Sequence, residues 1–216
     1  MRNIVFNDGM FCGVVRKHNS DSSPKSPAQK TEAELIAEAM ADGELSVLTL
    51  GNSFSVDAMQ YSYEIATDLG VEKVRLGNLY EPGCSILEHY NYANGNLSAF
   101  KQYNSDQMEM YNQIIAATKE KIVKNQSISM MIPTGTVIQN ARTSSLGDTL
   151  TRDGYHLSFD IGRYIAGVSY MATLSGKDPS NLKYMPEGVN ETHRQIAIDS
   201  VKKAIATSFA VTKVDL

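Results

Sequence analysis

The sequence has few of the residues that mark disulfide-rich, metal-binding or nucleic-acid-binding proteins. Only two of its 216 residues are cysteines, too few for a disulfide framework, and no metal-ligand spacing is present. We interpret Cys12 and Cys84 as buried thiols. The formal net charge of −4 and the isoelectric point near 5.6 give no basic excess for binding nucleic acid.

Long apolar segments are also missing. No apolar run approaches the roughly 20 residues that a membrane-spanning helix needs, so we expect no membrane span. The opening run MRNIVFND lacks the apolar core of a secretory signal. As it stands, the sequence therefore predicts a cytoplasmic location.

Residues 1–43 are predicted to be an N-terminal extension. A possible β-hairpin covers residues 3–16, because an Asp-Gly pair separates two apolar runs there. A flexible linker rich in Ser, Pro and Lys follows over residues 18–30. Thr31 begins a capping-box pattern that predicts a short helix to about Met40.

Residues 44–216 are predicted to form one domain, long enough to bury its own core. In this segment β-prone runs alternate with stretches of helical periodicity. The predicted strands are Leu45–Leu50, Lys73–Asn78 and Ser127–Ile132. The predicted helices are Ser55–Leu69, Ser105–Val123, a helix capped by Ser158, and about Glu191–Thr207. This alternation predicts an α/β fold with a parallel sheet covered by helices on both faces.

Three residues suggest a hydrolytic site. Ser53 lies between the first strand and the first helix of this domain, at the end of a strand where ligands bind open α/β sheets. Asp153 and His156 supply a carboxylate and an imidazole three residues apart. Serine hydrolysis needs a hydroxyl, an imidazole that takes its proton, and a carboxylate that orients the imidazole. The sequence therefore predicts a triad of Ser53, His156 and Asp153.

The motifs around these residues resemble those of the SGNH (GDSL-type) esterases. Residues 51–55, GNSFS, resemble the first block of that family, with Asn52 where aspartate is usual, and residues 153–158, DGYHLS, resemble the last. The longer runs GNSFSVDAMQY, GNLYEPGCSI, IPTGTVIQNARTS and LTRDGYHLSFDIGRYIAG are similar to a bacterial SGNH-like branch described as a domain of unknown function. The resemblance covers about residues 44–212 and implies a flavodoxin-like, three-layer α/β/α fold. Relatives in this branch are often exported.

The resemblance also implies a catalytic role for each of these residues. Ser53 is the nucleophile, His156 the general base and then the general acid, and Asp153 holds the imidazole tautomer. Gly83 resembles the second block, so the backbone N–H groups of Ser53 and Gly83 are the expected oxyanion donors.

The implied substrate is a small acyl ester, such as an acetyl group on a glycan. Asn52, Tyr155 and Arg142 are the candidate substrate-binding residues. The resemblance implies neither a metal nor an organic cofactor.

One block of the family pattern is missing. Ser53 and His156 are 103 positions apart, and no third block with its oxyanion-donating asparagine is found between them. Loss of such a donor costs about 10²–10³-fold in turnover. Asn78, Asn94 and Asn96 are candidate replacements.

We interpret the short spacing as the loss of internal strand–helix units, which predicts a reduced sheet. The strand Leu45–Leu50 would then expose unpaired backbone in the middle of the sheet. Three arrangements are open: the sheet closes up, the N-terminal hairpin helps to fill the gap, or the chain pairs with another copy. A further alternative is that the product folds poorly.

Structural alternatives exist for several of these residues. Ser53 could cap the following helix, and Asp153 could belong to an ordinary Asp-Gly turn. A salt link is the favoured alternative for Arg142. For the whole domain, the alternative function is a catalytically impaired remnant that binds carbohydrate or serves as a structural domain. A flavodoxin-like binding domain is disfavoured because residues 51–55 contain a single glycine.

Overall fold

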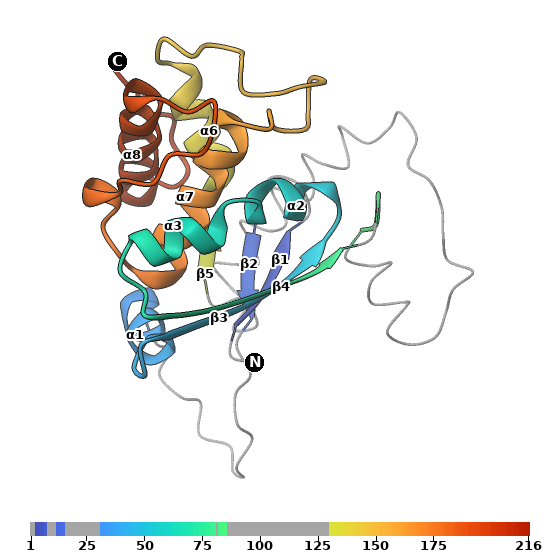
Figure 1. The fold of residues 1–216 in the computed structure, drawn as a ribbon, viewed down its shortest axis with the longest axis vertical. Helices are drawn as coiled ribbons and strands as arrows, with labels where there is room; N and C mark the ends of the chain where they lie inside the picture. Colours follow the sequence, from blue (N-terminus) through green and yellow to red (C-terminus); the bar gives the residue numbers. More distant parts are fainter. Residues whose placement is uncertain (1–2, 8–11, 16–30, 81, 86–129) are drawn as a thin grey trace.

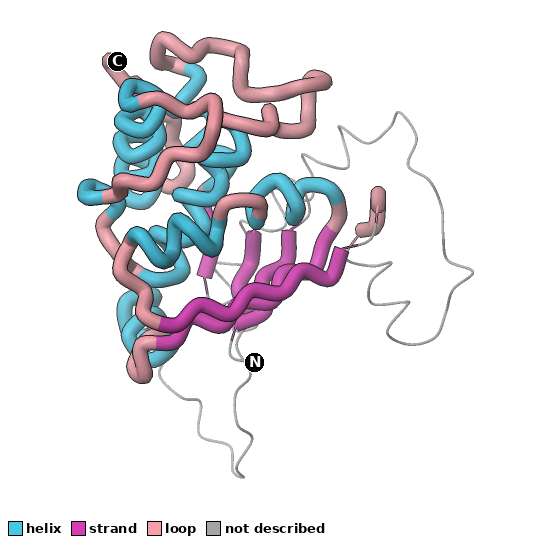
Figure 2. Tube along the Cα trace, in the orientation of Figure 1, coloured by secondary structure: helices cyan, strands magenta, loops and turns pink. Residues whose placement is uncertain are grey.

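The structure, a computed structural model, describes residues 3–7, 12–15, 31–80, 82–85 and 130–216. It has an α/β fold, as predicted, with a small sheet and helices packed against it (Figures 1 and 2). The elements in chain order are β1 (Asn3–Asn7), β2 (Cys12–Val15), α1 (Glu32–Ala39), β3 (Glu44–Gly51), α2 (Ser53–Met59), α3 (Ser62–Asp68), β4 (Lys73–Tyr80), β5 (Met130–Ile132), α6 (Thr134–Arg142), α7 (Ile161–Ser175), the 3-10 turn η2 (Pro179–Asn181) and α8 (Glu191–Ala206).

The strands form one sheet in the order β4-β3-β1-β2-β5. Strands β4, β3 and β1 are parallel to one another. Strand β2 is antiparallel to both β1 and β5, so β5 runs in the same direction as the three parallel strands. The prediction of a parallel sheet therefore holds for the described strands except β2.

The N-terminal hairpin fills the middle of this sheet. Strand β1 pairs with β3 along its whole length, from Asn3 opposite Val47 to Asn7 opposite Gly51. Since β4 pairs with the other side of β3, the expectation that this strand exposes unpaired backbone was wrong. Of the three alternatives, the described residues show the hairpin between β3 and β5. The predicted extension is thus joined to the sheet of residues 44–216.

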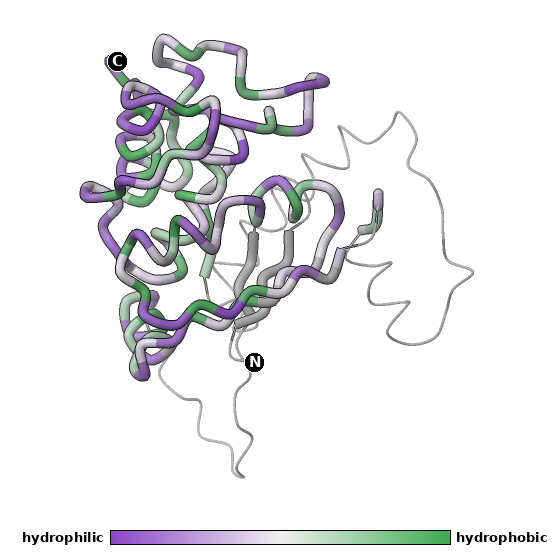
Figure 3. The backbone as a smooth tube through the Cα atoms, in the orientation of Figure 1, coloured by the Kyte–Doolittle hydropathy of each residue, from purple (hydrophilic) through white to green (hydrophobic). Residues whose placement is uncertain are grey.

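Helix α7 is the centre of the helical part of the molecule. All of its residues except Arg163 are buried, because it contacts α2, α3, α6, α8 and strand β5. Helix α8 is buried only in part, and hydrophobic and hydrophilic segments alternate along it in Figure 3. Its buried residues are Ile196, Ala197, Ile198, Ser200, Val201 and Ala204. The core therefore lies between the sheet, α7 and the helices around α7.

Close packing brings α7 against the chain that precedes the Asp153–His156 loop. A Cβ atom added to Gly162 would lie 2.4 Å from the carbonyl oxygen of Leu150. The same oxygen accepts a hydrogen bond from the Ser158 N–H over 2.8 Å. A side chain at position 162 would therefore displace the backbone at the base of this loop.

The helices differ from the predicted ones in three places. The single helix expected over Ser55–Leu69 is divided into α2 and α3 at Gln60 and Tyr61. Helix α6 was not predicted. Asp160, and not Ser158, is the N-cap of α7, although the Ser158 hydroxyl accepts a hydrogen bond from Gly162 N.

The other predicted elements agree with the structure where it describes them. The capping box of Thr31 and Glu34 is present at α1. The predicted helix over residues 105–123 and the start of the predicted strand at 127–129 lie outside the described residues. The three-layer α/β/α fold requires helices on both faces of the sheet, and this part of the expected fold stays a prediction. In the described ranges, no helix has the length and hydropathy needed to cross a membrane.

Candidate active site

Ser53, His156 and Asp153 are in contact in the predicted order. The Ser53 hydroxyl oxygen lies 2.7 Å from Nε2 of His156. Nδ1 of the same ring lies 2.5 Å from Oδ2 of Asp153. With the ring proton on Nδ1, the imidazole donates to the carboxylate and accepts from the serine hydroxyl, as a general base requires.

Ser53 is the first residue of α2 and follows β3 directly after Asn52. Oδ1 of Asn52 accepts a hydrogen bond from Phe54 N over 3.1 Å, and this caps α2. Nδ2 of Asn52 donates to the carbonyl oxygen of Cys84 over 3.1 Å. Both ends of this amide therefore take part in hydrogen bonds that position the ends of β3 and β4, and the contact of Asn52 with a substrate stays a prediction.

Asp153 and His156 lie on a closed loop. Thr151 and Leu157 form an isolated antiparallel bridge across its base, and Arg152 N donates to His156 O over 2.9 Å. At the tip, Gly154 has a φ of +96°, a conformation that glycine adopts without strain. The short hairpin geometry explains how residues three positions apart can pair.

The carboxylate of Asp153 organises this loop. Its Oδ1 accepts hydrogen bonds from His156 N over 2.7 Å and from Tyr155 N over 3.2 Å. Partial desolvation raises the pKa of Asp153, but the hydrogen bonds from the His156 ring and from these two N–H groups outweigh it and lower the pKa to about 2. Asp153 is therefore ionised at neutral pH and able to orient the imidazole.

A buried carboxylate that the sequence analysis missed supports the loop. Asp57 of α2 has 0% exposure and accepts a hydrogen bond from Leu157 N over 2.9 Å. Nη1 of Arg152 lies 3.1 Å from its Oδ1, and Nε of Arg163 lies 2.8 Å from the same oxygen. The available signal was the position of Asp57, four residues after Ser53 and so on the same face of one helix.

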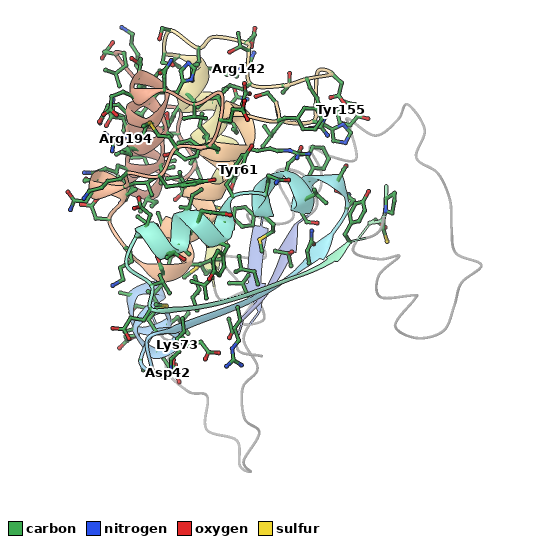
Figure 4. All side chains as sticks on the ribbon, viewed as in Figure 1. Asp42, Tyr61, Lys73, Arg142, Tyr155 and Arg194 are labelled. Carbon is green, nitrogen blue, oxygen red and sulfur yellow. The ribbon has the colours of Figure 1, made fainter. Side chains whose placement is uncertain are left out.

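Aromatic side chains surround His156. Its ring centroid lies 4.1 Å from that of Tyr155 and 5.4 Å from that of Phe54. Tyr155 is 62% exposed and lies at the end of the loop that reaches over α2 in Figure 4. This exposure beside the imidazole is compatible with the predicted contact between Tyr155 and a substrate.

A surface pocket of about 480 Å³ opens next to the loop. The guanidinium groups of Arg152 and Arg163 each lie 4.6 Å from the ring centroid of Phe159, and the Tyr61 hydroxyl donates to Phe159 O over 2.7 Å. The pocket is lined by Tyr61, Arg152, Ser158, Phe159, Asp160, Glu187 and Gly188. Arg152 connects this pocket to the triad, since it precedes Asp153.

Two further residues predicted for the site, Gly83 and Arg142, lie on different elements from the triad. Gly83 lies in the exposed turn after β4 with a φ of +67°, one residue before the carbonyl that Asn52 binds. Arg142 ends α6, where it forms an ion pair with Asp148 and donates to Gln139 Oε1 over 3.2 Å. The salt link considered for Arg142 is therefore present.

Of the asparagines considered as oxyanion donors, the structure describes Asn78. Its Oδ1 lies 2.8 Å from the Thr49 hydroxyl and 2.9 Å from the Ser55 hydroxyl. These contacts connect β4, β3 and α2 just below the nucleophile. Asn94 and Asn96 lie outside the described residues.

The side chain of Cys84 is buried, as predicted, whereas the side chain of Cys12 lies outside the described residues. Among the described residues, no three side chains of His, Cys, Asp or Glu are grouped closely enough to hold a metal ion.

The fold and this geometry define an α/β protein with a Ser–His–Asp arrangement at the end of a sheet strand. The family model of the domain of unknown function DUF4886 matches residues 87–204, more than half of the chain, and the chain belongs to this family. The matched segment contains Asp153 and His156.

A solved structure supports the fold. The crystal structure of a DUF4886 family protein from Bacteroides uniformis ATCC 8492 is similar, with a TM-score of 0.65 and 26% sequence identity. The similarity covers 79% of this chain and 98% of that chain. No curated protein matches this chain.

Proposed function

We propose that this protein is a serine esterase of the SGNH type, which acts on small acyl esters. The observation that carries the proposal is the continuous contact from Ser53 Oγ to His156 Nε2, 2.7 Å, and from His156 Nδ1 to Asp153 Oδ2, 2.5 Å. Ser53 supplies the nucleophile, and His156, 103 positions later, supplies the base, while Asp153, three residues before His156, orients the base.

In the first half of the reaction, Ser53 Oγ attacks the ester carbonyl carbon while His156 Nε2 takes the hydroxyl proton. The tetrahedral intermediate collapses, the bond to the leaving alkoxide breaks, and His156 returns the proton to that oxygen. In the second half, water attacks the acyl group on Ser53 with His156 again as base. Free acid and the starting enzyme result, and Asp153 keeps its negative charge throughout.

The backbone N–H groups of Ser53 and Gly83 are the proposed donors to the oxyanion. The N–H of Ser53, as the first residue of α2, has no acceptor within its own helix. The hydrogen bond between Asn52 and Cys84 supports Gly83 as the second donor, because it attaches the Gly83 turn to the residue before Ser53.

For the substrate, we propose an acyl ester such as an acetyl group on a glycan. Two exposed aromatic residues support a ring-shaped alcohol portion, since Tyr155 is 62% and Phe159 is 61% exposed. Tyr155 packs on the imidazole ring, and Phe159 lines the adjoining pocket. Such faces offer apolar area while the neighbouring charged groups offer hydrogen bonds.

Turnover of p-nitrophenyl acetate, together with labelling by a fluorophosphonate probe, tests the proposal. The wild-type protein should hydrolyse the ester and take up the probe, whereas Ser53→Ala should do neither while keeping its melting temperature. Ser180→Ala changes an exposed serine outside the triad and should behave as wild type. Labelling that persists unchanged in Ser53→Ala would show that Ser53 is not the nucleophile.

A further inference from the structure

We propose that Asp57 is the positioning residue that holds the loop of Asp153 and His156 within reach of Ser53. The inference rests on the proposed esterase function, because it concerns the geometry of the same triad. Asp57 itself is fully buried and therefore acts through other residues and not on the substrate.

Asp57 connects the two halves of the site. It lies one helical turn after Ser53 in α2, so a displacement of the helix moves both residues together. Its Oδ2 accepts the N–H of Leu157, the residue that follows His156, over 2.9 Å. One carboxylate thus links the helix that carries the nucleophile to the chain that carries the base.

The other side of the loop is attached to the same carboxylate. Arg152, which precedes Asp153, donates from Nη1 to Asp57 Oδ1 over 3.1 Å. It also donates to the carbonyl oxygen of Leu157. The loop is therefore held at both ends of the Asp153–His156 segment by charge-assisted hydrogen bonds, which are stronger than neutral ones.

Arg163 completes the arrangement from α7. Its Nε and Nη2 atoms lie 2.8 Å and 2.7 Å from Asp57 Oδ1. With a side-chain exposure of 11% for Arg163 and 25% for Arg152, both cations are largely removed from water. Loss of the carboxylate would leave them without their buried counter-charge, so the loop should shift.

Such a shift should affect the chemical step more than binding. The contact between Ser53 Oγ and His156 Nε2 is only 2.7 Å long, and a misplacement of about 1 Å can cost about 10²-fold in rate. The substitution Asp57→Asn keeps the size of the side chain and removes its charge. We expect kcat for p-nitrophenyl acetate to fall about 10–100-fold with KM changed less than about twofold.

A double-mutant comparison separates positioning from a general structural role. If Asp57 acts through His156, adding Asp57→Asn to His156→Ala should lower the residual rate by less than about twofold. If Asp57 had only a general structural role, Asp57→Asn would lower the rate by the same factor in the wild-type protein and in His156→Ala. The matched control is Asp68→Asn, because Asp68 of α3 also accepts loop N–H groups, those of Lys183 and Tyr184. It should keep wild-type kcat.

Hydrogen exchange provides a readout that does not depend on activity. Asp57→Asn should increase the exchange rate of peptide 151–158, which contains the Leu157 N–H, and Asp68→Asn should affect residues 183–184 instead. If the wild-type protein has no esterase activity, the proposed function is wrong. The hydrogen-exchange measurement would still show whether Asp57 positions the loop of Asp153 and His156.

If Asp57→Asn does not fold, Arg152→Met decides the question, since it removes one end of the attachment and leaves Arg163 to pair with Asp57. It should lower kcat about 10-fold and increase exchange in peptide 151–158. The proposal is overturned by unchanged exchange in this peptide, by a wild-type kcat in the folded variant, or by equal losses with and without His156.

Discussion

Nδ2 of Asn52 donates a hydrogen bond to the carbonyl oxygen of Cys84 over 3.1 Å. This contact joins the end of β3 to the turn that follows β4, one residue from the nucleophile on one side and one from Gly83 on the other. Since the two strands are neighbours in the sheet, the bond fixes the distance between the two proposed oxyanion donors.

Two substitutions of Asn52 should distinguish the effects of its two hydrogen bonds, one to Phe54 N and one to the carbonyl oxygen of Cys84. Asn52→Ser keeps a cap oxygen for α2 but cannot reach Cys84, whereas Asn52→Ala loses both interactions. We expect kcat/KM to fall about 10-fold in both variants, and the free energy of unfolding to fall by about 1–2 kcal/mol in Asn52→Ala and less in Asn52→Ser. Denaturant titration and ester turnover measure the two effects. Full activity in Asn52→Ser would mean that the Cys84 contact does not position the site.

Asp153→Asn should separate catalysis from stability. The amide would leave His156 in the wrong tautomer, so kcat should fall by about 10⁴-fold. The side chain of Asp153 is 39% exposed, and an asparagine Oδ1 can still accept the two backbone N–H groups, so the melting temperature at neutral pH should fall only modestly. A large loss of melting temperature with nearly unchanged specific activity would instead identify Asp153 as a structural turn residue.

Acid titration should reveal the ionised form of Asp153. The pKa of this group falls from 3.8 to about 2 on folding. Because the folded pKa is the lower one, the contribution of Asp153 to stability is fully present above about pH 5 and is lost as the pH falls toward 2. The difference in unfolding free energy between wild type and Asp153→Asn should therefore be constant from pH 7 to about 5 and shrink below about 4. A difference that grows in acid would contradict this sign.

Two glycines of α7 offer a matched test of packing. In Gly162→Ala the new Cβ would lie 2.4 Å from the backbone oxygen of Leu150, whereas in Gly167→Ala it would lie 2.8 Å from the terminal methyl of Ile65. Backbone cannot yield as easily as the end of a side chain. We expect Gly162→Ala to lower the free energy of unfolding by about 1–3 kcal/mol, more than Gly167→Ala, as denaturant titration would show. A larger loss of unfolding free energy in Gly167→Ala would show that the contact with the Leu150 oxygen does not determine the effect of Gly162→Ala.

Removal of residues 1–15 should make the protein self-associate. Without the hairpin, β3 and β5 would each present an unpaired edge, and such edges pair with other chains. Analytical ultracentrifugation should show oligomers of the shortened chain beside a smaller species for the full chain. If the shortened chain is a monomer that melts cooperatively, the hairpin is not needed to close the sheet.

Local patterns in the sequence predicted most of the described elements. Strands β3 and β4 and helices α7 and α8 follow hydrophobic runs or helical periodicity, and the α1 cap follows from Thr31 and Glu34. Helix α6 was missed because its sequence, TGTVIQNAR, has weak helix formers. It is stabilised by burial of Val137, Asn140 and Ala141 against neighbouring helices, so tertiary contacts override its propensity.

The contacts of the candidate site were predictable only in part. The motifs around Ser53, Asp153 and His156 predicted which residues should meet, and the structure brings these three together. Local sequence placed Asp57 on the same helix face as Ser53 but did not predict its partners, because Arg152 and Arg163 are 95 and 106 positions away. No local periodicity reports on pairing over such separations.

The position of the hairpin determines when the sheet can be completed during synthesis. Strand β2 leaves the ribosome more than a hundred residues before its partner β5, in which Met130 pairs with Val14. At a translation rate of about 5–20 residues per second, the edge of β2 that later pairs with β5 stays unpaired for several seconds. The N-terminal segment is thus the first part of the sheet to be made and among the last to be fully enclosed.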